Sequence, residues 1–153
     1  MSSILSLFDL KGTQLDAAER LESHLAVTAG AGSGKTRALV ARYLHFVEQG
    51  TPLRSLVAIT FTEKAAREMR SRIRREIENW LALSPLPSAP STSFHSAQDE
   101  MREGPEEGVW QTAFIELDSA RIGTIHSLCA DLLRLHPAEA GVDPRFAVLE
   151  EGL

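Results

Sequence analysis

Residues 29–36 read AGAGSGKT, and their types and spacing are suited to holding a phosphate group. The alternating glycines have no Cβ, so the backbone can adopt positive φ angles and approach a ligand closely. Successive backbone N–H groups in such a loop, together with the positive end of a following helix, attract an anion. We expect the Lys35 ammonium to reach the β- and γ-phosphates of a nucleotide and the Thr36 hydroxyl to bind Mg²⁺, which makes these two the predicted catalytic residues.

The spacing is that of a P-loop, G-x-x-x-x-G-K-[ST], with alanine in place of the first glycine. An apolar run at 25–27 precedes the loop and a stretch with helical periodicity follows it, which is the strand–loop–helix context that a P-loop needs. The alternative is a glycine-rich turn with a solvated lysine. The predicted nucleotide contacts in this segment are Ala29, Gly30, Ala31, Gly32, Ser33, Gly34, Lys35 and Thr36.

A second segment, residues 58–69, reads AITFTEKAAREM and runs from a predicted strand into a predicted helix. Ligands bind at the carboxyl ends of strands in open α/β sheets. Phe61 offers a ring that can stack on a base, and Thr62 offers a hydroxyl that can hold a phosphate of a single nucleic-acid strand. The alternative is that Phe61 belongs to the hydrophobic core.

A third segment, residues 124–129, reads TIHSLC and also lies where a strand passes into a helix. Thr124, His126 and Ser127 are presented in a similar way, so we predict that they contact the same kind of strand. The alternative for His126 is a hydrogen-bonded histidine at the end of a strand.

Hydrophobic periodicity predicts the elements that position these residues. Continuous apolar runs indicate buried strands at 25–28 and 56–61. Residues 121–125 (RIGTI) are a third strand candidate, and a last extended segment is expected at 146–149. Strands that alternate with helices predict an α/β fold with a parallel sheet flanked by helices. Helices are expected at 13–23, 35–48, 63–83, 109–118 and 126–135.

Residues 84–108 are rich in proline and serine and then in acids, so we expect a mobile loop within the domain. The net charge is −5, but the acids concentrate at 99–118 while residues 64–75, beginning with Lys64, are strongly basic. A basic helix is compatible with binding a polyanion on one face. By charge alone, a solvated helix surface with salt bridges is the favoured alternative.

The composition is that of an ordinary globular protein, with 43% hydrophobic and 24% charged residues among 153, so one domain is expected. The chain has no apolar run long enough to span a bilayer, and we expect a soluble cytoplasmic protein without a membrane partner. The single cysteine, Cys129, excludes an internal disulfide, and its apolar surroundings predict a buried structural thiol.

Taken together and in this order, the segments resemble superfamily 1 DNA helicases of the UvrD/Rep type, most closely the AddA/RecB-like branch. AGAGSGKT resembles motif I, ITFTEKAAREM motif Ia, and GTIHSLCADLLRLHP the motif that follows; residues 139–151 resemble the segment leading to the accessory domain of the family. The resemblance covers nearly the whole chain outside residues 84–118. It implies a RecA-like P-loop NTPase motor domain, with ATP and Mg²⁺ as cofactors, acting in DNA repair and recombination.

The resemblance also assigns residues. Gln14 matches the glutamine that reads the adenine edge, and Arg37 matches an arginine that packs near adenine; without the family, both would be ordinary surface residues. The family further implies single-stranded DNA contacts at Phe61, Thr62, Lys64, Thr124, His126 and Ser127. The family also implies partners for this chain, namely the remainder of the helicase or a nuclease partner subunit.

Two parts of the family motor are not found in this sequence, namely the strand acid pair that holds Mg²⁺ and the arginine fingers. Residues 113–118 (AFIELD) are predicted to be an amphipathic helix, and residues 146–151 (FAVLEE) match a segment where no catalytic acid is expected. We therefore expect an incomplete motor domain that binds nucleotide without useful turnover and does not unwind DNA. Missing strands leave a sheet edge unpaired, which predicts self-association.

Two other functions are compatible with parts of the sequence. A small kinase needs a lid and substrate-binding arginines, but residues 84–108 are too acidic and proline-rich for a phosphate lid. A module that binds single-stranded DNA or a partner without nucleotide would need only the second and third segments. The response of DNA binding to nucleotide, with and without Lys35, distinguishes these functions.

Overall fold

The computed structural model describes residues 3–30, 32–83 and 105–148, which are mostly helical with one two-stranded parallel sheet. Strand β1 (Val57–Thr60) pairs with β2 (Arg121–Thr124), so that Val57 lies opposite Arg121 and Thr60 opposite Thr124. Helices α3 (Glu63–Leu83) and α4 (Pro105–Glu116) lie between the two strands in the chain. Both strands and their parallel direction agree with the sequence prediction.

One face of this sheet is less buried than its continuous apolar sequence predicts. Ala58 is buried, whereas Val57 and Ile59 are 45% and 47% exposed. Successive side chains of a strand point to opposite faces, and only one face here packs against the helical core. The prediction that the strands are buried on both faces is therefore wrong for the described part of the chain.

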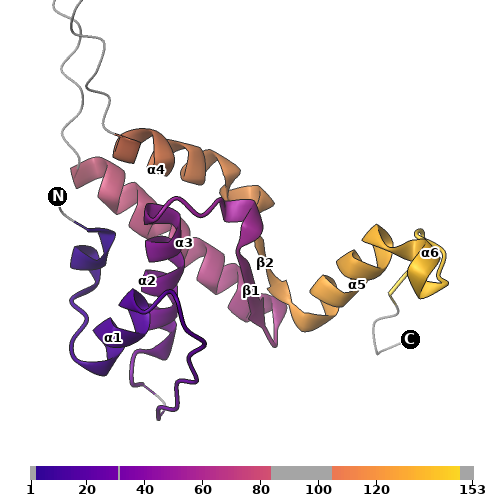
Figure 1. Ribbon diagram of the computed structural model, residues 1–153, viewed down its shortest axis with the longest axis horizontal. Helices are drawn as coiled ribbons and strands as arrows, with labels where there is room; N and C mark the ends of the chain where they lie inside the picture. The colour runs from indigo at the N-terminus through magenta and orange to yellow at the C-terminus, as the bar shows by residue number, and fades with distance from the viewer. Residues whose placement is uncertain (1–2, 31, 84–104, 149–153) are drawn as a thin grey trace, which may run out of the picture.

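The core forms where α2 (Lys35–Glu48), α3 and α4 pack together (Figure 1). Helix α3 has apolar residues at spacings of three and four, which places one continuous stripe against its neighbours. The rings of Trp80 and Trp110 meet between α3 and α4 with centroids 6.1 Å apart, an attractive tilted arrangement. The buried stripe of α3 consists of Ala66, Met69, Ile73 and Ile77.

The N-terminal segment is anchored to the end of α2. The 3₁₀ turn η1 (Ile4–Phe8) buries Ile4 and Phe8, and the Glu48 carboxylate accepts hydrogen bonds from Ser3 Oγ and the Ile4 backbone N–H at 2.8 and 2.7 Å. A carboxylate at this position satisfies backbone donors that the turn leaves free. Helix α1 (Thr13–Glu19) follows and is shorter than the predicted helix at 13–23.

Residues 25–28 do not form the predicted strand. They have no regular secondary structure, and Leu25 and Val27 are 38% and 56% exposed. A central parallel strand requires hydrogen-bonding neighbours, and β1 and β2 pair only with each other in the described residues. The apolar run therefore lacks the partners that would make it a strand.

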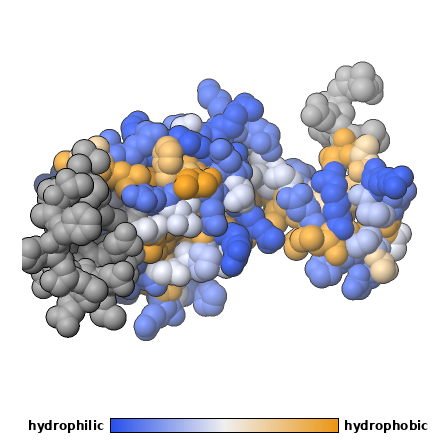
Figure 2. Space-filling model, turned by 90° about the horizontal axis from the view of Figure 1, so that it is seen from above, coloured by the Kyte–Doolittle hydropathy of each residue, from blue (hydrophilic) through white to orange (hydrophobic). Residues whose placement is uncertain are grey.

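Helices α5 (Ile125–Leu135) and α6 (Pro137–Ala140) project from the end of β2, away from the core (Figure 1). Hydrophobic residues consequently remain on the surface of this projecting part (Figure 2), and Leu135 is 60% exposed. Cys129 is exposed for the same reason, so the prediction of a buried thiol is wrong. The predicted extended segment at 146–149 is not a strand at 146–148, and residue 149 lies outside the described residues.

The predicted mobile loop at 84–108 falls mostly outside the described residues. Its last four positions, 105–108, form the first turn of α4, which corrects the loop boundary. Two short 3₁₀ turns lead into the strands, η2 (Leu53–Ser55) before β1 and η3 (Leu117–Ser119) before β2. Within the ranges that the structure describes, none of the helices combines the length and apolar character needed to cross a bilayer.

Candidate functional site

The glycine-rich loop ends at Gly34, which is the N-cap of α2. Gly32 and Gly34 have φ angles of +77° and +81°, conformations that side chains with a Cβ rarely adopt. The first backbone bond across the cap is donated by the Ala38 N–H to the Gly34 carbonyl at 3.0 Å. The N–H groups of the preceding helical residues have no acceptor within the helix, so they are available to an anion at the loop.

The Lys35 side chain lies over its own loop. Its Nζ donates hydrogen bonds to the carbonyl oxygens of Ala29 and Gly30 at 2.7 and 2.5 Å, while Ser33 Oγ donates to the Gly30 carbonyl at 2.8 Å. The ammonium is thus held beside the loop in an exposed position. Phosphate oxygens are stronger, charge-assisted acceptors than these neutral carbonyls, so an incoming phosphate can replace them. Ala31 lies outside the described residues.

Gln14 of α1 contacts the loop. Its Nε2 donates a hydrogen bond to the Ser33 carbonyl at 2.8 Å, and a Cβ added to Gly34 would lie 2.9 Å from the same nitrogen. Glycine at position 34 is therefore needed for two reasons, its backbone angle and its contact with Gln14. The Oε1 atom of Gln14 accepts no hydrogen bond from the described residues, so it can accept one from a ligand.

A hollow of about 410 Å³ lies beside Gln14 and the loop. Residues of α1 form one part of its wall and residues 25–29 another, and Lys35 and Ala38 of α2 also line it. Arg37 does not line this hollow. It lines a separate space of about 260 Å³ with Leu7, Phe8, Val40, Arg72, Arg75 and Glu76, so the structure does not bring Arg37 and Gln14 together.

Arg42 is a residue of this region that the sequence analysis missed. Its guanidinium donates hydrogen bonds to the backbone carbonyls of Ala17, Arg20 and Ser23 and lies 5.2 Å from the centre of the Phe46 ring. Burial lowers the pKa of Arg42 from its ordinary value. The available signal was one charged residue inside the apolar run Val40-Ala41-Arg42-Tyr43-Leu44.

The second and third segments meet at the carboxyl edge of the sheet. Because Thr60 is in register with Thr124, the residues that follow each strand emerge side by side. Thr60 Oγ1 also donates to the Gly123 carbonyl at 3.3 Å, which ties the two strand ends together. Phe61 is 94% exposed at this edge, so the alternative that it belongs to the core is wrong.

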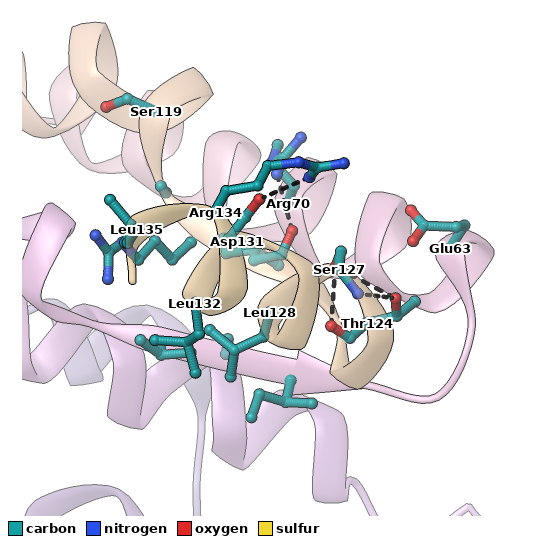
Figure 3. Close-up of a pocket in the computed structure, with 17 residues that line it drawn as sticks. Glu63, Arg70, Ser119, Thr124, Ser127, Leu128, Asp131, Leu132, Arg134 and Leu135 are labelled. Carbon is teal, nitrogen blue, oxygen red and sulfur yellow. Dashed lines mark hydrogen bonds and ion pairs between the residues drawn. The ribbon is translucent and has the colours of Figure 1, made fainter. Parts of the chain in front are cut away.

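The hydroxyl groups at this edge cap the following helices. Thr62 Oγ1 accepts a hydrogen bond from the Ala65 N–H at 3.1 Å, and Thr124 Oγ1 accepts one from the Ser127 N–H at 3.2 Å. Thr124 is buried and its side chain is paired with that of Ser127, whose Oγ donates to the Thr124 carbonyl at 2.8 Å (Figure 3). A Cβ at Gly123 would lie 2.6 Å from Ser127 Oγ, so this pairing requires glycine there.

Charges near this edge divide into two groups along α3. Arg72 pairs with Glu68 at 2.5 Å, Arg74 pairs with Asp118 at 2.7 Å, and Arg70 donates to the Ile122 carbonyl at 2.9 Å. The alternative of a solvated helix surface with salt bridges therefore applies to the middle of α3.

In the first turns of α3, Lys64 and Arg67 are exposed and have no ion pair within the described residues. His126 is exposed in the first turn of α5, where no hydrogen bond joins it to the part of the chain that the structure describes. Lys64, Arg67 and His126 are therefore available in the first turns of the helices that follow the two strands.

Between the strands and α5 lies a further hollow of about 520 Å³. Leu128 and Leu132 of α5 face the strands across it, and Asp131 and Arg134 form an ion pair of 3.6 Å at its rim (Figure 3). Apolar side chains of both strands and α5 line it together with polar and charged side chains such as Glu63, Arg70 and Arg121.

The donors that the loop presents fit a nucleotide triphosphate with its metal. Positive-φ glycines, free N–H groups of α2 and the Lys35 ammonium match the charge and shape of phosphate. The exposed Thr36 hydroxyl is one hard oxygen ligand of the kind that Mg²⁺ prefers. Within the described ranges, no group of three or more His, Cys, Asp or Glu side chains could hold a metal, so Mg²⁺ would depend on Thr36 and on phosphate oxygens.

The family model of the UvrD/REP helicase N-terminal domain matches residues 10–152. An ATP-dependent helicase/nuclease subunit from Lactobacillus gasseri is 37% identical over 127 residues, which is 83% of this chain and 9% of that protein. The proteins of the same name from Ligilactobacillus salivarius and Pelotomaculum thermopropionicum are 31% and 36% identical over 144 and 141 residues, covering 94% and 90% of this chain and 10% of each relative. The chain thus spans about a tenth of the length of these curated relatives.

Proposed function

The chain belongs to the UvrD/REP helicase N-terminal domain family, and on this premise we propose that its glycine-rich loop binds ATP with Mg²⁺. The observation that carries the proposal is the junction of loop and helix. Gly34 at φ +81° is the N-cap of α2, and Lys35, the first residue of the helix, places its ammonium on the carbonyls of Ala29 and Gly30 in the same loop. The residues proposed to bind the nucleotide are Ala29, Gly30, Ala31, Gly32, Ser33, Gly34, Lys35 and Thr36. The fold that this implies is the RecA-like P-loop fold of an ATP-dependent helicase.

Each group has a definite task in this proposal. The backbone N–H groups and Lys35 neutralise the phosphate oxygens, and the Thr36 hydroxyl orients Mg²⁺, which supplies additional positive charge to the phosphates when it is bound. Gln14 reads the adenine edge, because its amide can both donate and accept hydrogen bonds. Arg37 packs near the base only if its side chain leaves the separate space beside Phe8.

We further propose that the carboxyl edge of the sheet contacts single-stranded DNA. Phe61 presents nearly its whole ring for stacking on a base, and the Thr62 hydroxyl still has its proton to donate to a phosphate. Lys64 and His126 supply further contacts with the backbone of the strand. Thr124 and Ser127 act mainly by shaping the turn before α5, since their hydroxyls are paired with each other.

The relatives, which are named as helicase/nuclease subunits, suggest the setting in which these activities are used. We propose that the chain serves a DNA-repair and recombination helicase, together with the remainder of the motor and a nuclease partner. On its own it is expected to bind nucleotide without useful turnover and without unwinding DNA, because phosphoryl transfer needs several positioned charges at once. We also propose that the outer edge of β1, which has no strand partner among the described residues, can pair with another chain; a monomer independent of concentration in sedimentation would contradict this.

Calorimetric titration of the chain with Mg·ATP tests the central proposal. Wild type is expected to bind, and Lys35→Ala to bind at least tenfold more weakly, since it removes the charge that faces the phosphates. Lys11→Ala is the matched control, because Lys11 is an exposed lysine paired with Asp9 and outside the loop. Absence of binding by folded wild-type protein, or equal affinity in Lys35→Ala, would overturn the proposal.

DNA binding distinguishes a nucleotide-dependent site from a passive one. Fluorescence anisotropy with a labelled oligothymidine is measured with and without Mg·ATP, in wild type and in Lys35→Ala. A response to nucleotide in wild type alone supports a site that couples both ligands. Binding that ignores nucleotide in both proteins indicates a passive DNA-binding module instead.

A further inference from the structure

Arg42 lies in the middle of α2 and binds backbone carbonyls that belong to another part of the chain. Its Nη1 donates to the Ala17 carbonyl at 2.9 Å and to the Arg20 carbonyl, and its Nη2 approaches the Ser23 carbonyl at 3.4 Å. A guanidinium is a rigid planar fork with five N–H donors, so one side chain can hold several acceptors in a defined arrangement.

The acceptors of Arg42 are groups that need a partner. Helix α1 ends at Glu19, and the last carbonyls of a helix have no donor within it. Arg42 supplies donors to Ala17 in this last turn and to the residues that follow. The guanidinium also lies over the Phe46 ring, 5.2 Å from the ring centre, a favourable cation–π contact.

These carbonyls connect both walls of the hollow beside the glycine-rich loop. Ala17 and Arg20 line the hollow on the α1 side, and Ser23 lies just before residues 25–29, which form another part of its wall. Arg42 itself extends from α2, one helical turn beyond Ala38, which also lines the hollow. One side chain therefore ties two walls, which have no strand pairing to hold them, to the helix that begins at the loop.

Gln14 is three residues before Ala17 on α1, so the two lie on the same side of the helix. The Gln14 Nε2 atom reaches Ser33 at 2.8 Å, and its contact with Gly34 allows no Cβ. Such a close fit depends on the distance between α1 and the start of α2. Within the described residues, the hydrogen bond from Arg42 to the Ala17 carbonyl joins α1 directly to α2.

We propose that Arg42 is a positioning residue for nucleobase selection, which holds α1 so that the Gln14 amide meets the adenine edge. This proposal rests on the proposed function, since it assumes that the loop binds ATP. Arg42 touches neither phosphate nor base and acts through Gln14. Losing it is expected to weaken discrimination between adenine and guanine while leaving phosphate binding at the loop intact.

The experiment measures calorimetric affinities for Mg·ATP, Mg·GTP and inorganic tripolyphosphate. Wild type is expected to prefer ATP over GTP by roughly tenfold, the scale of one well-placed hydrogen bond. Arg42→Gln should bring the two affinities within about threefold of each other and leave tripolyphosphate binding unchanged. The conservative Arg42→Lys, which keeps the charge but not the planar fork, should give an intermediate ratio and also serves if Arg42→Gln does not fold.

A matched control and a double variant separate positioning from a merely structural role. Arg74→Gln removes an arginine that also lies over an aromatic ring, Phe114 at 5.3 Å, but outside the hollow, and it should keep the wild-type ratio. Gln14→Ala should lose the preference for ATP. Adding Arg42→Gln to Gln14→Ala should change the ratio no further, because both act on the same contact.

The outcomes assign failure to one proposal or the other. If Gln14→Ala loses the preference while both Arg42 variants keep it, Arg42 has no positioning role and nucleotide binding stands. An equal loss of affinity for all three ligands in the Arg42 variants means general destabilisation and overturns the inference, as does a wild type that binds ATP and GTP equally. Folded wild type that binds neither ATP nor tripolyphosphate overturns the proposed function itself.

Discussion

The Nε2 atom of Gln14 donates a 2.8 Å hydrogen bond to the backbone carbonyl of Ser33, 19 positions further along the chain. This bond fastens α1 to the glycine-rich loop before any ligand is present. It occupies one N–H of the amide and leaves the other N–H and the oxygen for a base. The proposed nucleotide site is thus partly pre-organised by contacts within the chain, which would lower the ordering that binding requires.

Gly34→Ala is expected to weaken ATP binding through this contact. An added Cβ would lie 2.9 Å from Gln14 Nε2, so the amide must move, and the left-handed backbone at φ +81° adds about 1–2 kcal/mol of strain. Gly50→Ala is the matched control, since Gly50 has φ +85° but no atom within 4 Å of an added Cβ. Both variants should lose similar stability in thermal melts, and only Gly34→Ala should lose ATP affinity in calorimetry. Equal ATP affinities in the two variants would count against the role of the Gln14 contact.

Phe61→Ala is expected to weaken binding of single-stranded DNA without changing stability. The ring is 94% exposed, so its loss removes little packing, whereas stacking on a base contributes about 1–3 kcal/mol. Ile115→Ala on α4, which is 77% exposed, controls for loss of an apolar surface residue. Anisotropy with oligothymidine should respond to Phe61→Ala alone. Unchanged affinity, or equal wild-type affinity for duplex and single strands at matched salt, would argue against stacking.

Glu48→Gln is expected to destabilise the fold by about 1–3 kcal/mol. The carboxylate accepts from Ser3 Oγ and the Ile4 N–H and lies 2.8 Å from His45 Nδ1, so an amide would turn an N–H₂ group toward at least one donor. Glu68→Gln, which removes an exposed carboxylate paired with Arg72, should change stability by less than about 0.5 kcal/mol. Urea unfolding measures both. A Glu48→Gln value as small as that of the control would show that the N-terminal turn is held by apolar packing alone.

Tyr43 is expected to make stability depend on alkaline pH. Burial raises the pKa of Tyr43 to about 12 from the ordinary value of 10.0, in spite of the nearby Arg70, which lowers it. The neutral phenol is therefore favoured in the folded state, and its contribution is complete below pH 10 and lost as the pH rises from 10 toward 12. Tyr43 is the only tyrosine of the chain, so phenolate absorbance reports its titration directly. A midpoint near the ordinary value would contradict the burial of the hydroxyl.

Tyr43→Phe tests the same site at neutral pH. The buried hydroxyl has no hydrogen-bond partner among the described residues, so its removal should change stability by less than about 1 kcal/mol. The variant should also lose the pH dependence between pH 10 and 12 that is assigned to this residue. A large destabilisation in urea unfolding at neutral pH would mean that the hydroxyl makes a bond that stabilises the fold.

Local patterns in the sequence were sufficient for much of the fold. The period of three and four residues predicted α3, whose buried stripe from Ala66 to Ile77 faces the core, and the glycine spacing predicted a loop that ends at the start of α2. The runs at 56–61 and 121–125 predicted two strands, whose parallel pairing follows from the helices between them. These features depend on neighbours within a few residues, which a sequence displays directly.

Features that depend on distant neighbours required the tertiary structure. Residues 25–28 have the composition of a buried strand, but a strand exists only where another strand donates and accepts its hydrogen bonds. Whether Phe61 and Cys129 are buried was likewise decided by what packs against β1 and α5, and both are exposed. The sequence does not indicate which carbonyls Arg42 binds, because every residue has the same backbone carbonyl. The available signal was one charged residue within an apolar run.

The sequence by itself thus determined which side chains this protein can offer to a phosphate and the bounds of α2 and α3, because those properties are local. Only the tertiary structure decided that Gln14 reaches Ser33, that Arg42 joins two walls of one hollow, and that the hydroxyls of Thr124 and Ser127 pair with each other. Such contacts arise when the apolar faces of α2, α3 and α4 pack and bring distant backbone groups within hydrogen-bond distance.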